Sequence, residues 1–265
     1  MRRMNEKVNS ILERNNRVRS IEKALSILEV LNQDHELSLG EISIRLNMDK
    51  GTVHRLIGTL KHSGYIDQNP NNRKYANSFK FFEMGNNVVD KKGLRKTAEP
   101  LIEEAALLAG ETINLGVLYE SHIIYIDKIE SHETIKVGLN IGKRIPVYCT
   151  GLGKVILAFS PKKVVDSILK DISFEAFTQK TVKNRQELNN QLEEIRKRGY
   201  CMDDEEYVEG LICVAAPIFD HSGEPVAAIS ISVPKYRYTE SIRITDFTAI
   251  AIETAKNISR KLGHN

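Results

Sequence analysis

The feature that most constrains this chain is the order of the patterns in its first 80 residues, which is helix, helix, helix and hairpin. The first helix is predicted from Ser20, which can cap it, through apolar residues at helical spacing up to Leu31. Ser38 and Glu41 have the spacing of a capping box at the start of a second, short helix. This order predicts a winged helix-turn-helix DNA-binding domain over residues 17–79.

The third helix and the hairpin supply the candidate DNA contacts. Asp49 can cap this helix, Val53 and Leu56 belong to its apolar stripe, and Gly64 ends it. The expected DNA-binding residues lie on its polar side and just after the turn at residues 69–72; they are Lys50, Gly51, Thr52, His54, Arg55, Arg73 and Lys74. The first residues of a recognition helix contact base edges, and cations of a wing contact phosphates. The alternatives are a solvated helix face and an ordinary charged hairpin.

The distribution of charge agrees with a nucleic-acid partner at this end. Residues 1–80 contain 14 Lys and Arg against 9 Asp and Glu, whereas the remainder contains 24 against 26. No run of 18 or more apolar residues is present, and no apolar segment follows the basic N-terminus, so we expect a cytoplasmic protein with no membrane partner. Residues 1–16 lack an apolar face and are expected to form a flexible tail.

After the first 80 residues, the residue patterns predict a linker helix over residues 80–93 and a second domain over residues 94–265. Strands are expected at residues 112–118, 122–129, 134–139, 212–219 and 226–233. Helices are expected from Leu94 to Gly110, after Thr150, after Pro161, and at residues 184–198 and 241–262. This mixture predicts an α+β domain in which helices flank an antiparallel sheet.

Several segments of the chain resemble the IclR family of bacterial transcriptional regulators. They follow one another in the family's order over about residues 17–265, at residues 18–25, 49–56, 62–65, 149–158, 199–206, 210–217 and 228–234. The resemblance implies a GAF-like effector domain, a homodimer or homotetramer, a palindromic operator in double-stranded DNA and a small organic acid as effector. It favours a repressor of a catabolic operon and leaves RNA polymerase open as a further partner. The second half looks most like the KdgR-like subgroup, which controls uronate or pectin catabolism and implies a sugar-derived keto acid.

The resemblance also implies an effector pocket, formed by Gly151, Leu152, Asp203, Cys213, Ser230 and Ser232. The chemistry of these residues agrees with that role. Gly151 opens a helix, whose free amides and positive dipole end attract a carboxylate. Ser230 and Ser232 alternate along a strand and therefore share a face. Asp203 can accept from a ligand hydroxyl, or donate when protonated, and Cys213 can form a small pocket wall.

Simpler roles exist for the same residues. The two serines also fit ordinary strand positions, and Asp203 fits a helix or turn cap. Leu152 is bulkier than the residue that IclR-type pockets often carry there, so a small or branched ligand remains an alternative effector. A second domain that only assembles subunits is a further alternative, and it predicts that no small molecule alters DNA binding.

An enzyme is the remaining alternative. It would use Cys149 or Cys213 as a nucleophile and His122, His132 or His221 as a base, but no nucleophile motif surrounds either cysteine. The three cysteines form no C-x-x-C pair and are expected to be buried free thiols, with no metal site and no cofactor. The segment at residues 151–154 lacks P-loop spacing, because Tyr148 stands where that motif needs glycine and Val155 follows the lysine. We therefore predict a regulator and not an enzyme.

Overall fold

The computed structural model describes residues 18–90, 93–133, 139–237 and 244–264, and the chain divides into two compact units, Met1–Val88 and Val89–Asn265. The boundary falls within the predicted linker. The expected tail at residues 1–16 lies outside the described residues.

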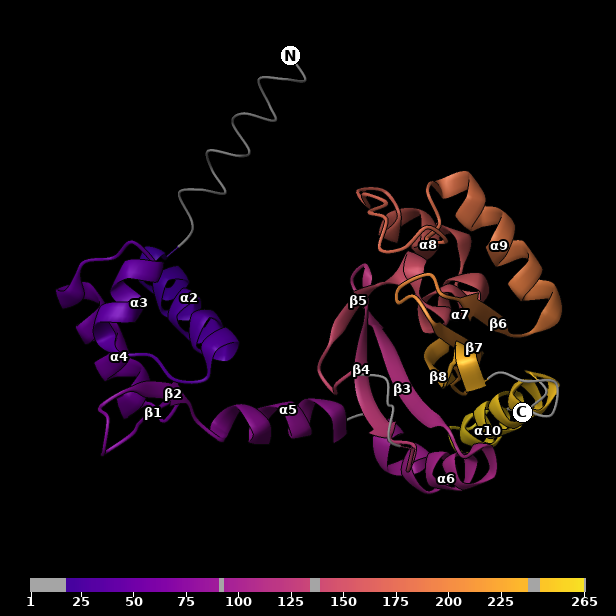
Figure 1. Ribbon diagram of the computed structural model, residues 1–265, viewed down its shortest axis with the longest axis horizontal. Coiled ribbons are helices and arrows are strands. Elements are labelled where there is room, and N and C mark those ends of the chain that lie inside the picture. The colour runs from indigo at the N-terminus through magenta and orange to yellow at the C-terminus, as the bar shows by residue number, and fades with distance from the viewer. Residues whose placement is uncertain (1–17, 91–92, 134–138, 238–243, 265) are drawn as a thin grey trace, which may run out of the picture. The chain divides into compact units, whose positions relative to one another are not determined.

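The N-terminal unit has the predicted order of three helices and a hairpin (Figure 1). Its elements are α2 (Arg19–Asp34), α3 (Leu39–Arg45), α4 (Lys50–His62), β1 (Ile66–Gln68) and β2 (Tyr75–Asn77), followed by α5 (Lys80–Asp90). Strands β1 and β2 pair antiparallel, and Tyr75 also bridges to Leu37 ahead of α3. The hairpin is thereby held to the helices as a wing, which confirms the predicted winged helix-turn-helix.

Two of the three predicted helix caps are present. The Ser38 hydroxyl accepts from the Glu41 amide at 3.3 Å, and the Glu41 carboxylate accepts from the Ser38 amide at 2.7 Å, which confirms the capping box. The Asp49 carboxylate accepts from the Thr52 amide at 2.8 Å and caps α4. Each of these caps satisfies amide donors that a helix start otherwise leaves unpaired.

The expected cap at Ser20 is wrong. Helix α2 begins at Arg19, and its N-cap residue is Val18, which makes no side-chain cap. The amides of Ile21 and Glu22 already donate to the Val18 carbonyl, so helical hydrogen bonding starts before Ser20 can act as a cap.

The three helices and the wing share one apolar core. Its buried members are Ile27, Leu31, Leu37, Ile42, Val53, Ile57 and Ile66. Each such side chain stabilises the fold by about 1.5–3 kcal/mol when it leaves water. Because Val53 and Ile57 face this core, the opposite side of α4 remains at the surface.

The C-terminal unit is built on one six-stranded antiparallel sheet with the order β5-β4-β3-β8-β7-β6. Its strands are β3 (Thr112–Tyr119), β4 (His122–Ile129), β5 (Arg144–Pro146), β6 (Cys201–Asp204), β7 (Leu211–Phe219) and β8 (Pro225–Pro234). Its helices are α6 (Leu94–Ala109), α7 (Gly151–Phe159), α8 (Lys162–Ile168), α9 (Arg185–Arg198) and α10 (Ile244–Lys261), with short 3-10 turns η1 (Val147–Cys149) and η2 (Lys235–Arg237). The predicted α+β domain with an antiparallel sheet is confirmed.

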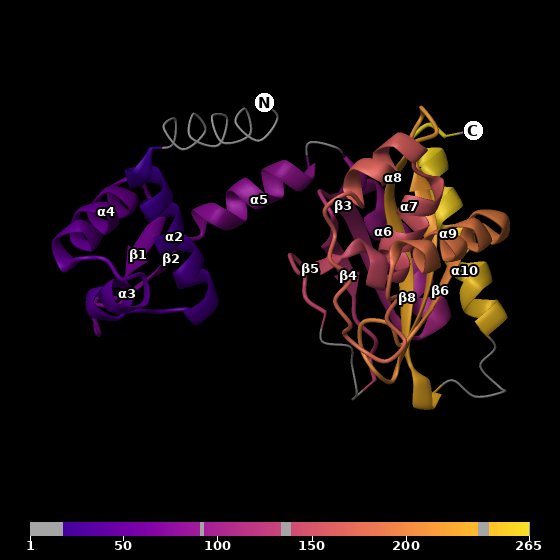
Figure 2. The ribbon, with the colours of Figure 1, turned by 90° about the horizontal axis from the view of Figure 1, so that it is seen from above.

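Helices cover both faces of this sheet (Figures 1 and 2), and each face has its own apolar core. Helices α6 and α10 pack on one face, where Ile102 and Phe247 meet strand residues such as Ile229. Helices α7, α8 and α9 cover the other face, where Leu152 and Leu188 are buried. Polar side chains on the α7 face are therefore enclosed between the sheet and a helical layer.

Three features of this unit differ from the expectation or lie beyond it. Strands β5 and β6 were not predicted, because each has only three or four residues and carries charged side chains. Most of the strand expected at residues 134–139 falls outside the described residues, as do residues 91–92 of the expected linker helix. The last helix is described from Ile244, so its expected start at residue 241 also lies outside the described part.

Candidate functional site

The polar side of α4 places most of the expected DNA-binding residues at the surface. Lys50, Gly51, His54 and Arg55 are exposed, and Thr52 is half-buried. A Cβ added at Gly51 would approach the Asp49 carboxylate to 3.3 Å, so a side chain at this position would press on the helix cap. Hydrogen bonds from Thr52 lower the pKa of Asp49, which keeps the cap ionised. The helix therefore presents a firmly capped first turn with polar groups outward, as reading base edges requires.

A groove beside this face contains two cations that sequence reasoning missed. Its volume is about 370 Å³, and its lining residues are Arg19, Ser20, Lys23, Thr52, Arg55, Leu56 and Thr59. Arg19 and Lys23 lie one turn apart at the start of α2, and both are exposed. Their spacing was visible in the sequence, but only the packing of α2 against α4 brings them beside Arg55.

The two expected wing cations have different surroundings. Arg73 is exposed at the hairpin turn with a positive φ of 60°, whereas Lys74 is half-buried and lies 3.7 Å from the Glu41 carboxylate. Glu36 accepts hydrogen bonds from the side chains of Asn69 and Asn72, at 3.0 and 2.9 Å. The turn is thus fixed to the segment ahead of α3, and Arg73 is the wing cation that faces solvent.

In the second unit, four of the six expected effector residues line up across the sheet. Asp203 of β6 is paired with Cys213 of β7, and Cys213 is paired with Ser232 of β8. Ser230 lies two residues earlier on the same face of β8 and is paired with Asn114 of β3. Side chains paired in this way point to the same face of a sheet. We call Asn114, Asp203, Cys213, Ser230 and Ser232 the polar cluster.

Hydrogen bonds connect the members of this cluster. The Asn114 amide nitrogen Nδ2 donates to Ser232 Oγ at 3.0 Å and to Ser230 Oγ at 3.4 Å. Cys213 Sγ lies 3.3 Å from Ser232 Oγ. All are buried, and Asn114 Oδ1 has no partner among the described residues. Sequence reasoning missed Asn114, because a single asparagine in an apolar strand gave no signal before its pairing with Ser230 was known.

The start of α7 differs from the expectation in one respect. Thr150 caps the helix by accepting from the Gly153 amide at 2.9 Å, and the Gly151 amide donates to Asp203 Oδ2 at 3.2 Å. The carboxylate of Asp203, a residue of β6 that also accepts from the Glu206 amide, therefore accepts from the helix-start amide that was expected to bind a ligand carboxylate. The amide of Leu152 remains as the first-turn donor without a described partner. The Leu152 side chain itself is buried in the core.

The environment of Asp203 disfavours the ionised form of its carboxyl group. Burial, and next to it the charge of nearby Glu206, raise the pKa of Asp203 to about 7, although Lys154 acts in the opposite direction. Lys154 is itself buried in α7, where it pairs with Glu206 and donates to Gln191 Oε1 at 2.6 Å. This carboxyl can therefore serve as an acceptor or a donor near neutral pH.

The free cysteines are buried thiols, as expected. Burial raises the pKa of Cys149 and of Cys213, and raises that of Cys201 to about 12, so all three stay protonated. Cys149 Sγ donates to the Pro146 carbonyl at 3.4 Å and Cys213 contacts Ser232, so within the described part neither is paired with a histidine. No group of three or more metal-binding side chains is found among the described residues. Nor does any described helix combine the length and apolar character that a membrane span needs.

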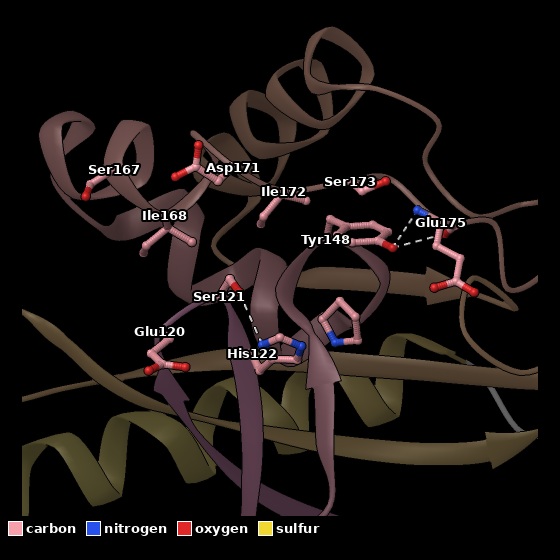
Figure 3. Close-up of a pocket in the computed structure, with 11 residues that line it drawn as sticks. Glu120, Ser121, His122, Tyr148, Ser167, Ile168, Asp171, Ile172, Ser173 and Glu175 are labelled. Carbon is pink, nitrogen blue, oxygen red and sulfur yellow. Dashed lines mark hydrogen bonds between the residues drawn. The ribbon is translucent and has the colours of Figure 1, made fainter. Parts of the chain in front are cut away.

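A cavity with an acidic lining lies elsewhere in this unit (Figure 3). It measures about 550 Å³, between the β3–β4 turn, Tyr148 and the chain after α8. Tyr148 is held by the Glu175 backbone, at 3.0 Å from its carbonyl and 2.8 Å from its amide. The lining includes the carboxylates of Glu120, Asp171 and Glu175 and none of the polar cluster. An acidic lining suits an organic acid poorly, so this cavity is not our candidate effector site.

Comparison with known proteins agrees with both units. The helix-turn-helix domain model of the IclR family matches residues 20–70, and the model of the bacterial transcriptional regulator IclR C-terminal domain matches residues 86–260. The transcriptional regulator KdgR of Escherichia coli is 36% identical over 248 residues, which is 94% of each chain. The Transcriptional repressor IclR of the same organism is 32% identical and covers 93% of this chain and 90% of its own.

A solved structure shows the same fold. The crystal structure of the Thermotoga maritima IclR has a TM-score of 0.80 and 33% identity, covering 93% of this chain and 99% of that one. A helix-turn-helix domain implies DNA binding, and the IclR C-terminal domain implies a small-molecule effector. The regulators of this family are not enzymes. The chain is a KdgR-like member of the IclR family of bacterial transcriptional regulators.

Proposed function

We propose that this chain is a cytoplasmic repressor of a catabolic operon whose DNA binding is controlled by a small keto or hydroxy acid. The observation that carries the proposal is the polar cluster, which lies buried against the first turn of α7. A domain that only assembles subunits has no need for so many polar groups in its interior, because burying them costs free energy unless each is paired. The names of the E. coli relatives KdgR and Transcriptional repressor IclR support the repressor role.

The chemistry of the cluster favours an acid that also carries oxygen functions. The Leu152 amide at the positive end of α7 can donate to a carboxylate. The hydroxyls of Ser230 and Ser232 can donate to a keto oxygen, and Asn114 Oδ1 is an acceptor for a ligand hydroxyl. A sugar-derived keto acid combines these groups.

In the N-terminal unit we propose that α4 enters the major groove through Lys50, Gly51, Thr52 and His54. Arg55 and Arg73 then contact phosphates, and Lys74 positions the wing through Glu41. The groove cations Arg19 and Lys23 add phosphate contacts on the α2 side.

Exposed apolar residues support a homodimer, with a tetramer as a further assembly. Ile21 and Leu25 of α2 are exposed together with Val18 just before that helix, and Phe82 of α5 is exposed together with Phe79 just before it. Contiguous apolar surface marks a contact with another chain. A two-fold pair of these units would match a palindromic operator, and RNA polymerase stays open as a partner at the promoter.

The effector role is tested with a Ser230→Ala, Ser232→Ala double variant. We expect unchanged operator binding, but loss of the response to the keto or hydroxy acid that releases the unmodified protein. Calorimetry with that acid should show the loss of binding directly. Ser167→Ala, on the acidic cavity of Figure 3, is the matched control and should respond normally. An unchanged response in the double variant would remove the polar cluster from the effector site.

A further inference from the structure

A second cavity of the C-terminal unit, of about 530 Å³, lies beside β7 and α10. Its apolar lining residues are Phe159, Gly199, Ala216, Pro217, Phe219, Ile252 and Ala255, and its polar ones are Arg198, Lys256, Ser259, Arg260 and His264. The volume is in the range of small-molecule sites. None of these residues belongs to the polar cluster or to the acidic cavity of Figure 3.

The cavity lies beside the half of β7 that strand β6 does not cover. Strand β6 pairs with β7 only from Ile212 to Ala215, so the second half of β7 has no described strand on that side. Pro217 lies in this uncovered half and has no amide to offer to a further strand. The space is bordered by side chains instead, which gives it an apolar floor.

Aromatic rings form one wall of the cavity. The rings of Phe159 and Phe219 meet edge to face with centroids 5.5 Å apart, and His264 stacks on Phe219 at 5.1 Å. The His264 ring is fixed by its Nδ1, which lies 3.2 Å from the Asp220 carbonyl. This wall is thus preformed and can receive an alkyl chain or an aromatic ring.

The charged part of the lining is entirely basic. Arg198, Lys256 and Arg260 contribute three cations, and no carboxylate is among the lining residues. Arg198 lies 3.7 Å from the Glu194 carboxylate, and Arg260 lies 3.7 Å from that of Glu253. Both ion pairs are exposed to solvent and therefore contribute little free energy. Lys256 has no ion pair among the described residues. These cations remain available to an anionic group.

We propose that this cavity binds an amphipathic monocarboxylate, with its apolar body on the Phe159–Phe219 wall and its carboxylate on Lys256 and Arg260. The proposal goes beyond the effector site, since it gives the unit a second small-molecule site of different chemistry. Phe159 lies on α7, the helix that Gly151 opens, and Phe219 lies on β7, the strand that carries Cys213 of the polar cluster, so a ligand here contacts two elements that also border the proposed effector site.

The test is equilibrium binding to the full chain of 4-phenylbutyrate and octanoate, with 4-phenylbutanol and 1-octanol as neutral counterparts. We expect the acids to bind and the alcohols to bind far more weakly. In a Lys256→Gln, Arg260→Gln double variant the acid affinity should fall about tenfold or more, because two charge-assisted contacts are lost. Both side chains are exposed, so the fold should be retained, which circular dichroism checks.

The matched control is Lys197→Gln with Lys261→Gln, which removes two exposed cations from α9 and α10 outside the cavity and should bind the acids normally. Unaltered binding of the acids in the Ser230→Ala, Ser232→Ala variant separates this site from the proposed effector site. Absence of saturable binding, equal affinity for acids and alcohols, or an equal loss in the control variant would overturn the proposal. The proposal would also fail if the Lys256→Gln, Arg260→Gln variant bound the acids normally and changed only the sedimentation of the protein. The cavity surface would then be a contact between copies of this chain.

Discussion

Gly58 and Gly153 both lie inside helices, but their surroundings predict opposite effects of a side chain. A Cβ at Gly58 of α4 would meet no atom within 4 Å, whereas one at Gly153 of α7 would lie 2.2 Å from the Val147 carbonyl oxygen. Gly58→Ala should therefore raise the free energy of unfolding by about 0.5–1 kcal/mol through helix propensity. Gly153→Ala should lower it by about 3 kcal/mol, because backbone cannot move away easily. Urea unfolding of the free protein measures both, and a stable Gly153→Ala variant would contradict the close contact of α7 with η1.

Asp203 should make stability depend on pH. Its pKa is about 7 in the folded chain against an ordinary 3.8, so the folded state holds a proton that the unfolded chain has released between these values. The stability that this proton contributes is complete below about pH 4 and is lost as the pH rises toward 7. Asp203→Asn removes the titration, so the variant should gain stability relative to the unmodified chain across this interval. Urea unfolding at a series of pH values measures this. If the free energies of unfolding of the variant and of the unmodified chain changed in parallel with pH, Asp203 would not titrate in this way.

At the scale of elements, the recognition role of α4 predicts a difference between its two ends. Lys50→Ala or Thr52→Ala should reduce discrimination between operator and random DNA by about 1–3 kcal/mol, because these residues face base edges. Lys61→Ala, at the far end of the same helix, removes a side chain that bonds to Gln68 and should leave discrimination intact. Competition binding with both duplexes measures the ratio. Full discrimination in the first two variants would place the base contacts on another element.

The groove between α2 and α4 predicts a different signature. Lys23→Gln should weaken binding to operator and random duplex alike, and should reduce the slope of log affinity against log salt by about 1, as the loss of one phosphate contact does. A salt titration with both duplexes gives the slope. If Lys23→Gln weakened the operator alone, Lys23 would be reading sequence and our assignment of the groove to phosphate would fail.

The elements also show how far the sequence alone could lead. The helical spacing of Val53 and Leu56 and the capping pattern at Ser38 were sufficient for the winged helix-turn-helix, because both signals are local. Strand β6 was missed because Asp203 and its neighbours look like a polar turn and become a strand only by pairing with β7. Asn114 was missed for the same reason, since its role depends on a residue 116 positions away in the chain. Contacts of this kind follow from sheet register, which residue patterns do not specify.

At the scale of the whole molecule, the exposed apolar residues predict that assembly and operator binding are linked. Phe79→Ser with Phe82→Ser should shift the chain toward monomer in sedimentation and weaken binding to a two-half-site operator more than binding to one half-site. Tyr236→Ser, an exposed aromatic residue of the other unit, serves as the control. A double variant that kept its oligomeric state would move the subunit contact away from the start of α5.

The central claim is that one unit reads DNA and the other senses an organic acid. Its most direct measurement is fluorescence anisotropy of the full chain with the DNA upstream of its own gene and with a random duplex of equal length. A salt series is followed by a panel of keto and hydroxy acids. We predict selective binding with a steep salt dependence, which one of the acids weakens. Equal binding to both duplexes at every salt concentration would contradict the recognition role of α4, and selective binding that no acid alters would contradict the sensor role of the polar cluster.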